Sequence, residues 1–289
     1  MHPFRYARPD SLAEAVALLD EHGPRAQIIA GGTDLVIGLR DRTIEPDVVI
    51  DLKRIPDLAP HIRLVDGRLS ISAGTVMSDI ESDAAIAEHF PALAESAAVV
   101  GSVQIRNRAT LAGNICNASP AADTAPPLLV HRAEVVAFGP DGARRIPICE
   151  FFVRSRQTTL RRGELVTAVE LPLPAVRTGD SYVRLTRRRG TDLASITMGC
   201  AVDASGTTRL AYGSVGPKPL LFSDDSGVLA DAAAPDEAKT PILETMLAEA
   251  SPSARSVRAS PEYRLAMLRV LAVRALHSAL RRRDGGQAR

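Results

Sequence analysis

The part of this sequence that is hardest to fit into a regular fold is the segment from Gly101 to Pro127, GSVQIRNRATLAGNICNASPAADTAPP. It shows no sustained helical or strand periodicity and contains Gly, Asn, Ser, Thr and Pro throughout. A structureless stretch of more than about 15 residues in a compact domain is usually functional or disordered. Apolar side chains at Val103, Ile105 and Leu111 argue against disorder. We therefore expect a long ordered loop with a function.

A second segment rich in glycine lies near the beginning of the chain. Residues 27–30 predict a short buried strand, residues 31–34 (Gly-Gly-Thr-Asp) a tight turn, and residues 35–40 the start of a helix. Two residues without Cβ let backbone N–H groups approach an anion, and the helix start adds partial positive charge. A diphosphate fits such a turn, with Thr33 donating its hydroxyl and Asp34 capping the helix or accepting from ribose or amide groups. Gly-Gly after a strand is also a plain turn, and the GxGxxG pattern of Rossmann folds is absent.

The long segment contains its own dense group of small and polar residues, TLAGNICNASPAAD from Thr110 to Asp123. Asn, Ser and Asp side chains at such short intervals indicate contact with a polar ligand. The alternative is a loop whose side chains satisfy its own backbone. Neither segment offers a Ser–His–Asp set or two close carboxylates, so both are suited to binding rather than to acid–base catalysis.

A length of 289 residues predicts about two domains, and Pro172 to Gly179 is the best linker candidate. Capping boxes predict helices after Ser11, with Glu14, and at Ser78–Glu81. The other expected elements are the strand 48–51, a hairpin of 62–65 and 68–73, a helix over 91–100, a hairpin of 133–138 and 144–148, the strand 165–171, strands at 182–185, 195–202 and 207–215, and a long helix after Ser260, Pro261 and Glu262.

Composition excludes several classes of function. Lys and Arg total 35 against 34 for Asp and Glu, a net charge of +1, so no overall field favours nucleic acid or an anionic membrane surface. No apolar run approaches the roughly 20 residues of a membrane span. Cys116, Cys149 and Cys200 are too few and too far apart for an iron–sulfur cluster or a Cys-rich zinc site, and the histidines show no paired spacing. These residues therefore predict no metal site on this chain. Because the first residues also lack the apolar segment of a secretory signal, we expect the protein to be cytoplasmic.

Three segments together resemble one known family. They are AGGTDL from Ala30, TLAGNICNASPAADTAPPL from Thr110, and TRRRGTDLA from Thr186. The family is the FAD-binding medium subunit of molybdenum hydroxylases, which includes the flavin subunits or domains of xanthine dehydrogenase and aerobic carbon monoxide dehydrogenase. The resemblance extends over nearly the whole chain, from FRYARPDSLAEAVALL to ASPEYRLAMLRVLAVRAL. The paired motifs at these separations are specific, whereas either alone is not.

The resemblance implies an α+β fold: a vanillyl-alcohol-oxidase or PCMH-type FAD-binding domain over 1–174, with subdomains of about 1–58 and 59–174, and a C-terminal α+β domain over 179–289. Residues 31–34 would hold the diphosphate, residues 110–114 would form a facing loop, and Asp123 would hydrogen-bond towards the ribityl or flavin region. An apolar contact and a basic residue close to the cofactor would come from Leu165 and Arg184. The full set of implied cofactor-binding residues is Ala30, Gly31, Gly32, Thr33, Asp34, Leu35, Val100, Gly101, Thr110, Gly113, Asn114, Asn117, Asp123, Leu165 and Arg184.

The sequence departs from the family pattern at several places. Ala112 stands where relatives have the first of two glycines before the asparagine, and Val100 or Leu193 stands where many place an aromatic ring over the flavin. The Cys-rich insert that adds an iron–sulfur cluster in one branch is missing. No His or Cys occupies an evident flavin-attachment position, and Cys116 is interpreted as a packed small residue, so the resemblance implies noncovalent FAD.

The implied function is that of the flavoprotein subunit of an oxidoreductase complex, with no acid–base catalyst on this chain. Molybdopterin on a large partner would hydroxylate the substrate, [2Fe-2S] clusters on a small partner would deliver the electrons to FAD, and NAD, oxygen or a quinone would accept them. The assembly expected is a dimer of heterotrimers. Two alternatives stay open: a stand-alone FAD-dependent oxidoreductase acting on its own small-molecule substrate, and a noncatalytic scaffold that kept the fold without flavin.

Overall fold

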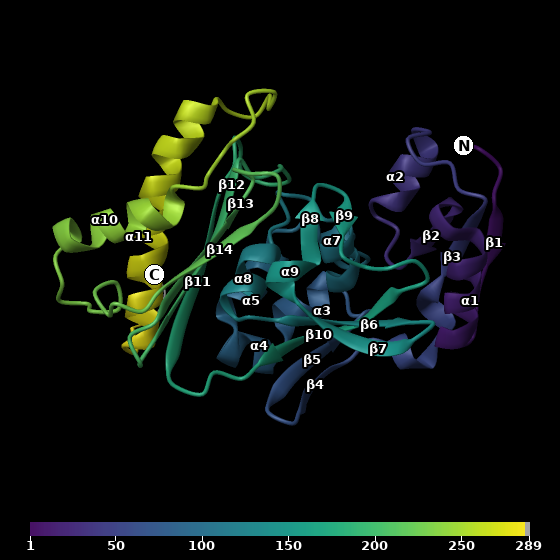
Figure 1. Ribbon diagram of the computed structural model, residues 1–289, viewed down its shortest axis with the longest axis horizontal. Coiled ribbons are helices and arrows are strands. Elements are labelled where there is room, and N and C mark those ends of the chain that lie inside the picture. Colours follow the sequence, from purple (N-terminus) through teal and green to yellow (C-terminus); the bar gives the residue numbers. More distant parts are fainter. Residues whose placement is uncertain (287–289) are drawn as a thin grey trace.

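Three β-sheets follow one another along the chain and lie side by side in the molecule (Figure 1). This computed structural model describes residues 1–286, so the last three residues of the expected C-terminal domain, 287–289, lie outside the described residues. The sheets have three, five and four strands, and residues 152–158 form a separate two-stranded hairpin. Among residues 1–286, no helix combines the length and the hydropathy needed to cross a bilayer.

The N-terminal sheet is parallel, in the order β1-β3-β2. Ser11 caps the first helix by accepting from the N–H of Glu14, as predicted, while the Glu14 carboxylate accepts from the N–H of Asp10. The predicted strand, glycine turn and helix over residues 26–40 are present. The elements are β1 (Arg5–Ala7), α1 (Leu12–His22), β2 (Ala26–Ile29), α2 (Leu35–Arg40) and β3 (Val48–Asp51).

The central sheet is antiparallel, in the order β4-β5-β10-β6-β7, and both predicted hairpins belong to it. Its apolar side chains share one core with the neighbouring helices and the first sheet. The elements are β4 (Ile62–Val65), β5 (Arg68–Ser72), α3 (Met77–Ser82), α4 (Ala84–His89), α5 (Pro91–Ala98), β6 (Glu134–Gly139), β7 (Gly142–Pro147), α9 (Ile148–Phe151), β8 (Phe152–Arg154), β9 (Gln157–Thr158) and β10 (Leu165–Pro172).

Two predictions in this part of the chain were wrong. The capping box at Ser78 does not exist, because α3 already begins at Met77 and its N-cap, Val76, makes no side-chain bond. A tertiary contact begins that helix instead: the N–H of Met77 donates to the carbonyl of Ala109 at 2.8 Å. The expected long loop contains three short helices, α6 (Val103–Arg106), α7 (Leu111–Cys116) and α8 (Ala125–Val130).

The C-terminal sheet is antiparallel with its strands in sequence order, β11-β12-β13-β14. Helix α11 packs against it, Ser260 caps that helix as predicted, and Figure 1 shows the helix along the outer face of the sheet. Strand β14 was not predicted, and β10 and β11 leave only residues 173–177 as the link between the sheets. The elements are β11 (Thr178–Leu185), β12 (Ile196–Asp203), β13 (Thr208–Gly213), β14 (Leu220–Asp224), α10 (Asp236–Leu247) and α11 (Pro261–Arg283).

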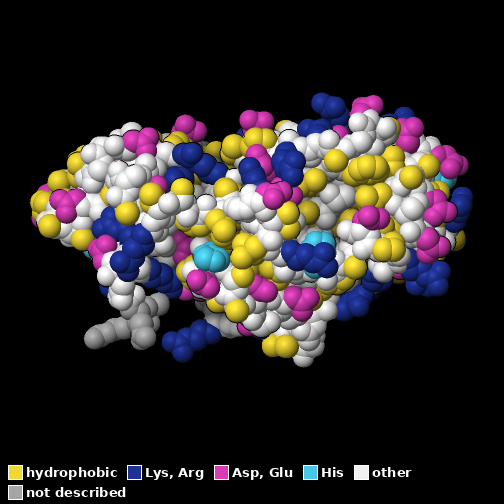
Figure 2. Space-filling model, turned by 90° about the horizontal axis from the view of Figure 1, so that it is seen from below, with side chains coloured by type: hydrophobic (Ala, Val, Ile, Leu, Met, Phe, Trp, Pro, Cys, Tyr) yellow, Lys and Arg dark blue, Asp and Glu magenta, His cyan; other side chains and the backbone are white. Residues whose placement is uncertain are grey.

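The surface mixes charges of both signs. On the face seen from below in Figure 2, Lys and Arg side chains are interspersed with Asp, Glu and apolar groups. This distribution agrees with the formal net charge of +1.

Candidate functional site

The glycine turn after β2 packs directly against the chain that precedes α7. A Cβ built on Gly31 would lie 1.9 Å from the carbonyl oxygen of Arg108, so only glycine fits there. Gly32 has a φ of +79°, in the left-handed region that glycine adopts without strain. The fold thus brings the two glycine-bearing segments together, and Figure 1 shows α2 and α7 towards the same side of the molecule, above the central sheet.

The turn presents several unused backbone donors. Within residues 1–286, the N–H groups of residues 32–35 donate to no internal acceptor. Thr33 is half-buried beside them. Asp34 is the N-cap of α2, but its side chain makes no capping bond, which corrects one of the two roles predicted for it. Consecutive free N–H groups in a turn form a concave site for an anion, and this donor set fits a diphosphate.

The second segment is built around the first turn of α7. Thr110 is its N-cap, and its hydroxyl oxygen accepts from the N–H of Gly113 at 3.0 Å. Among residues 1–286, and apart from the backbone of α7 itself, a Cβ built on Gly113 would meet only that hydroxyl, at 3.0 Å, so the space beside it is otherwise open. Asn114 Oδ1 accepts from the Thr124 hydroxyl at 2.7 Å. In the part of the chain that the structure describes, the Asn114 side-chain NH₂ donates to no acceptor, so it is available to a ligand.

Asp123 lies in a polar cluster with two residues of β11. The Tyr182 hydroxyl donates to Asp123 Oδ1 at 2.5 Å, and Arg184 Nη1 lies 3.4 Å from the same oxygen. Arg184 Nη1 also donates to the Val99 carbonyl at 3.1 Å. Desolvation raises the pKa of the Asp123 carboxyl, although the bond from Tyr182 and the charge of Arg184 act against that rise. Burial, together with the adjacent Asp123, raises the pKa of Tyr182 well above its ordinary value.

The segment at Val100 and Gly101 is joined to the loop that follows β11. Gly101 has a φ of +56°, and its carbonyl accepts from the Thr191 hydroxyl at 2.9 Å. Leu193, in the same loop, is 59% exposed. The third resembling segment, residues 186–194, therefore contacts the chain at Gly101, which precedes the second resembling segment.

The other predicted site residues have varied surroundings. Leu165 is 1% exposed within the central core, and Asn117 is the C-cap of α7 without a side-chain hydrogen bond among the described residues. The Ala30 carbonyl accepts from Lys53 Nζ at 3.4 Å. Burial raises the pKa of the Cys116 thiol to about 12, so it is not a thiolate at neutral pH.

Sequence analysis missed Tyr182, although a signal for it was present. Side chains two residues apart on a strand point to the same face, so Tyr182 shares the face of Arg184. The partner, Asp123, is 59 residues away in sequence, and only the fold brings the two together.

Comparison with known proteins agrees with this geometry. Residues 2–174 match the family model described as the FAD binding domain in molybdopterin dehydrogenase, and residues 181–279 match the CO dehydrogenase flavoprotein C-terminal domain. The chain is 34% identical to the carbon monoxide dehydrogenase medium chain of Hydrogenophaga pseudoflava, over 96% of each chain. It is 29% identical to the xanthine dehydrogenase FAD-binding subunit of Escherichia coli O157:H7, over 95% of each.

A solved structure gives the same result for the fold. The carbon monoxide dehydrogenase of Hydrogenophaga pseudoflava, in a form lacking the Mo-pyranopterin moiety, matches with a TM-score of 0.88 and 32% identity, covering 98% of this chain and 99% of that one. The predicted mixed α+β fold, a PCMH-type FAD-binding domain followed by the flavoprotein C-terminal domain, is confirmed. The chain belongs to the FAD-binding medium subunits of the molybdenum hydroxylase family, the flavoprotein subunits of oxidoreductase complexes of the carbon monoxide dehydrogenase and xanthine dehydrogenase type.

Proposed function

We propose that this chain binds one FAD noncovalently between the turn at residues 31–35 and the segment at residues 110–117. The observation that supports this most strongly is the row of free N–H groups at residues 32–35, packed by Gly31 against the chain before α7. These groups would bind the diphosphate, and the free amide of Asn114 would donate to the cofactor from the facing side. The other predicted contacts, such as Ala30, Leu35, Val100, Asn117 and Leu165, stay predictions.

FAD, when bound, supplies the redox chemistry, and the residues of this chain bind and orient it. Asp123 would accept hydrogen bonds near the ribityl or flavin region, held in place by Tyr182 and Arg184. Arg184 is a positive charge only 15% exposed, so it would favour negative charge on the cofactor, although Asp123 neutralises part of its field. No residue of the site is required as an acid–base catalyst.

Within the complex, we propose that electrons arrive from [2Fe-2S] clusters on a small subunit, after substrate hydroxylation at molybdopterin on a large subunit, and leave to NAD, oxygen or a quinone. The medium-chain relative, which matches over 96% of each chain, supports this arrangement. We further propose a cytoplasmic dimer of heterotrimers. We divide the chain into a FAD-binding domain at 1–174, with subdomains near 1–58 and 59–174, and a C-terminal domain from 179.

Purification of the native protein tests both parts of this proposal. We expect a yellow chain that releases FAD on acid denaturation and copurifies with two different polypeptides, together with molybdenum and iron. A colourless protein that takes up no added FAD would contradict the cofactor assignment. Flavin that stays attached after denaturation would contradict noncovalent binding. A single chain that is catalytically competent alone would favour the stand-alone oxidoreductase.

A further inference from the structure

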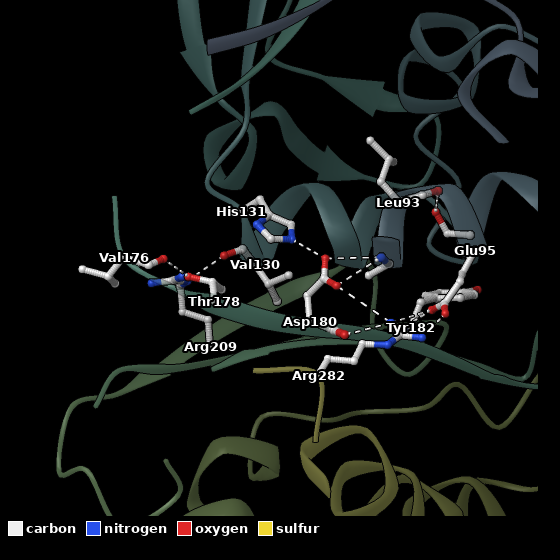
Figure 3. A network of polar contacts seen from close by, with 12 residues as sticks. Leu93, Glu95, Val130, His131, Val176, Thr178, Asp180, Tyr182, Arg209 and Arg282 are labelled. Carbon is white, nitrogen blue, oxygen red and sulfur yellow. Dashed lines mark hydrogen bonds and ion pairs between the residues drawn. The ribbon is translucent and has the colours of Figure 1, made fainter. Parts of the chain in front are cut away.

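A buried histidine–aspartate contact joins the C-terminal sheet to the helices of the central part of the chain. His131 Nε2, at the end of α8, lies 2.7 Å from Asp180 Oδ2 on β11, and their side chains are 3% and 2% exposed (Figure 3). The N–H of Ala92, in the first turn of α5, lies 3.3 Å from both carboxylate oxygens of Asp180. One aspartate on β11 therefore contacts two helices at once.

The edge of β11 that does not pair with β12 is covered by an ion pair. Arg282 of α11 pairs with Glu95 of α5, and Arg282 Nη1 donates to the Asp180 carbonyl at 2.9 Å. Glu95 Oε2 accepts from the N–H of Tyr182 at 3.3 Å. These side chains occupy edge groups that would otherwise be unpaired, and Figure 3 shows them converging on the strand.

Three alternate residues of β11 face the FAD-binding part of the chain. Asp180 contacts His131, Tyr182 contacts Asp123, and Arg184 contacts both Asp123 and the Val99 carbonyl. Their spacing of two residues places them on one face of the strand. Ser181, which points the other way, donates to the Ala275 carbonyl of α11 at 2.8 Å.

We infer that Asp180 and His131 are positioning residues for the cofactor site: they fix β11 so that Tyr182 and Arg184 hold Asp123 and the Val99 carbonyl in place. This inference rests on the proposed FAD site at Asp123. A strand is stiff along its length, so an anchor at Asp180 sets the position of Arg184, about 13 Å further along. The role inferred here is to fix the orientation of β11 rather than to add stability, because the cost of desolvating two polar groups offsets much of their attraction.

The test compares Asp180→Ala with a matched control on the same strand, Ser181→Ala, in the full-length chain. Both remove a buried hydrogen-bonding side chain, but only Asp180 faces the FAD-binding part. We expect Asp180→Ala to speed hydrogen–deuterium exchange of the apoprotein at residues 99–101 and 121–124, and to weaken FAD binding about tenfold. Ser181→Ala should lower the melting temperature without either effect.

A double mutant separates positioning from general destabilisation. In an Arg184→Met, Tyr182→Phe background, the anchor has nothing left to position, so Asp180→Ala should weaken FAD binding less than twofold further. The inference would be overturned if Asp180→Ala weakened FAD binding by the same factor in this background as in the wild-type chain. It would also be overturned if Asp180→Ala alone changed neither the exchange rates nor the FAD affinity. If the wild-type chain takes up no FAD, the proposed function fails, and hydrogen–deuterium exchange at residues 99–101 and 121–124 then tests the positioning role alone. Faster exchange in Asp180→Ala would support that role, and unchanged exchange would overturn it.

Discussion

Glycines serve opposite purposes at the C-terminal sheet and at α7. In the sheet, a Cβ on Gly199 would lie 2.9 Å from the backbone of Pro126, and one on Gly213 would lie 2.6 Å from the Pro120 carbonyl oxygen. The protein itself therefore fills the space left by these two glycines. Gly113 has open space beside it, next to the unused amide of Asn114. Glycines of the first kind permit chain-on-chain packing, whereas one of the second kind leaves room for a ligand.

The largest expected effect is a loss in the free energy of unfolding when a glycine of the C-terminal sheet is replaced. Gly213→Val must push the Pro120 segment or Thr197 away, because Thr197 Oγ1 also lies 2.6 Å from the added Cβ. Overpacking of this kind costs about 3 kcal/mol. Urea unfolding of the apoprotein should show that loss. If Gly213→Val were as stable as wild type but bound FAD more weakly, Gly213 would leave room for a ligand and the distinction between the two kinds of glycine would be wrong.

Gly32→Val should affect both properties, since this glycine has a φ of +79° and lies among the free N–H groups. A branched residue in the left-handed region costs about 1–2 kcal/mol, and its side chain would obstruct the diphosphate. We expect lower stability and FAD affinity reduced more than about tenfold, which corresponds to 1.4 kcal/mol. Gly142→Val is the control, because that hairpin glycine has a φ of +93° with nothing within 4 Å of its Cβ. It should show the strain alone, with normal FAD affinity.

Asn114→Ala should weaken FAD binding by about 1–3 kcal/mol, roughly ten- to hundredfold, while the fold stays intact. The variant also removes the acceptor of the Thr124 hydroxyl. Thr124→Val removes the same internal bond from the other side and keeps the Asn114 amide, so it serves as the control. Equal FAD losses in the two variants, measured by titration, would mean that the segment is structural and that its assignment to the cofactor is wrong.

The smallest effect concerns the pH dependence of stability at Asp123. Because the pKa of its carboxyl is raised in the folded state, its contribution to stability is fully present below the unfolded pKa and is lost as the pH rises through the folded pKa. Asp123→Asn does not ionise. The melting temperature of its apoprotein should therefore rise relative to that of wild type as the pH increases from acid to neutral. If the melting temperature of Asp123→Asn instead rose relative to wild type as the pH fell, the pKa of Asp123 would not be raised by folding.

Sequence patterns predicted the longer elements and both glycine-bearing segments, because local chemistry determines them. The hairpin around Asp66-Gly67 and the Ser260 cap of α11 are examples. Helices α6 and α7 were missed because 4 and 6 residues are too short to show a period. Strand β14 depends on pairing with β13, and α3 begins through a tertiary contact of the Met77 N–H with the Ala109 carbonyl.

The candidate site also has a part that local sequence predicts and a part that depends on contacts between distant segments. Residues 31–35 and 110–114 could be found from their small side chains and turn chemistry alone. The contacts of Tyr182 with Asp123 and of His131 with Asp180 could not, because the partners lie 59 and 49 residues apart in sequence. Contacts between distant segments follow from the packing of β11 on α5 and α8, which no local pattern encodes.

The central claim, that the open space beside Gly113 is occupied by FAD, is tested most directly by titrating FAD into Gly113→Val apoprotein. The added Cβ lies 3.0 Å from Thr110 Oγ1, the capping oxygen of α7, so that hydroxyl must shift slightly and we expect the chain to fold with a small decrease in melting temperature. Gly216→Val, at another position where a Cβ meets only a single atom, at 3.4 Å, is the control and should bind FAD normally. We predict that Gly113→Val loses at least about tenfold in FAD affinity, or 1.4 kcal/mol. Wild-type affinity in a folded Gly113→Val protein would contradict the claim.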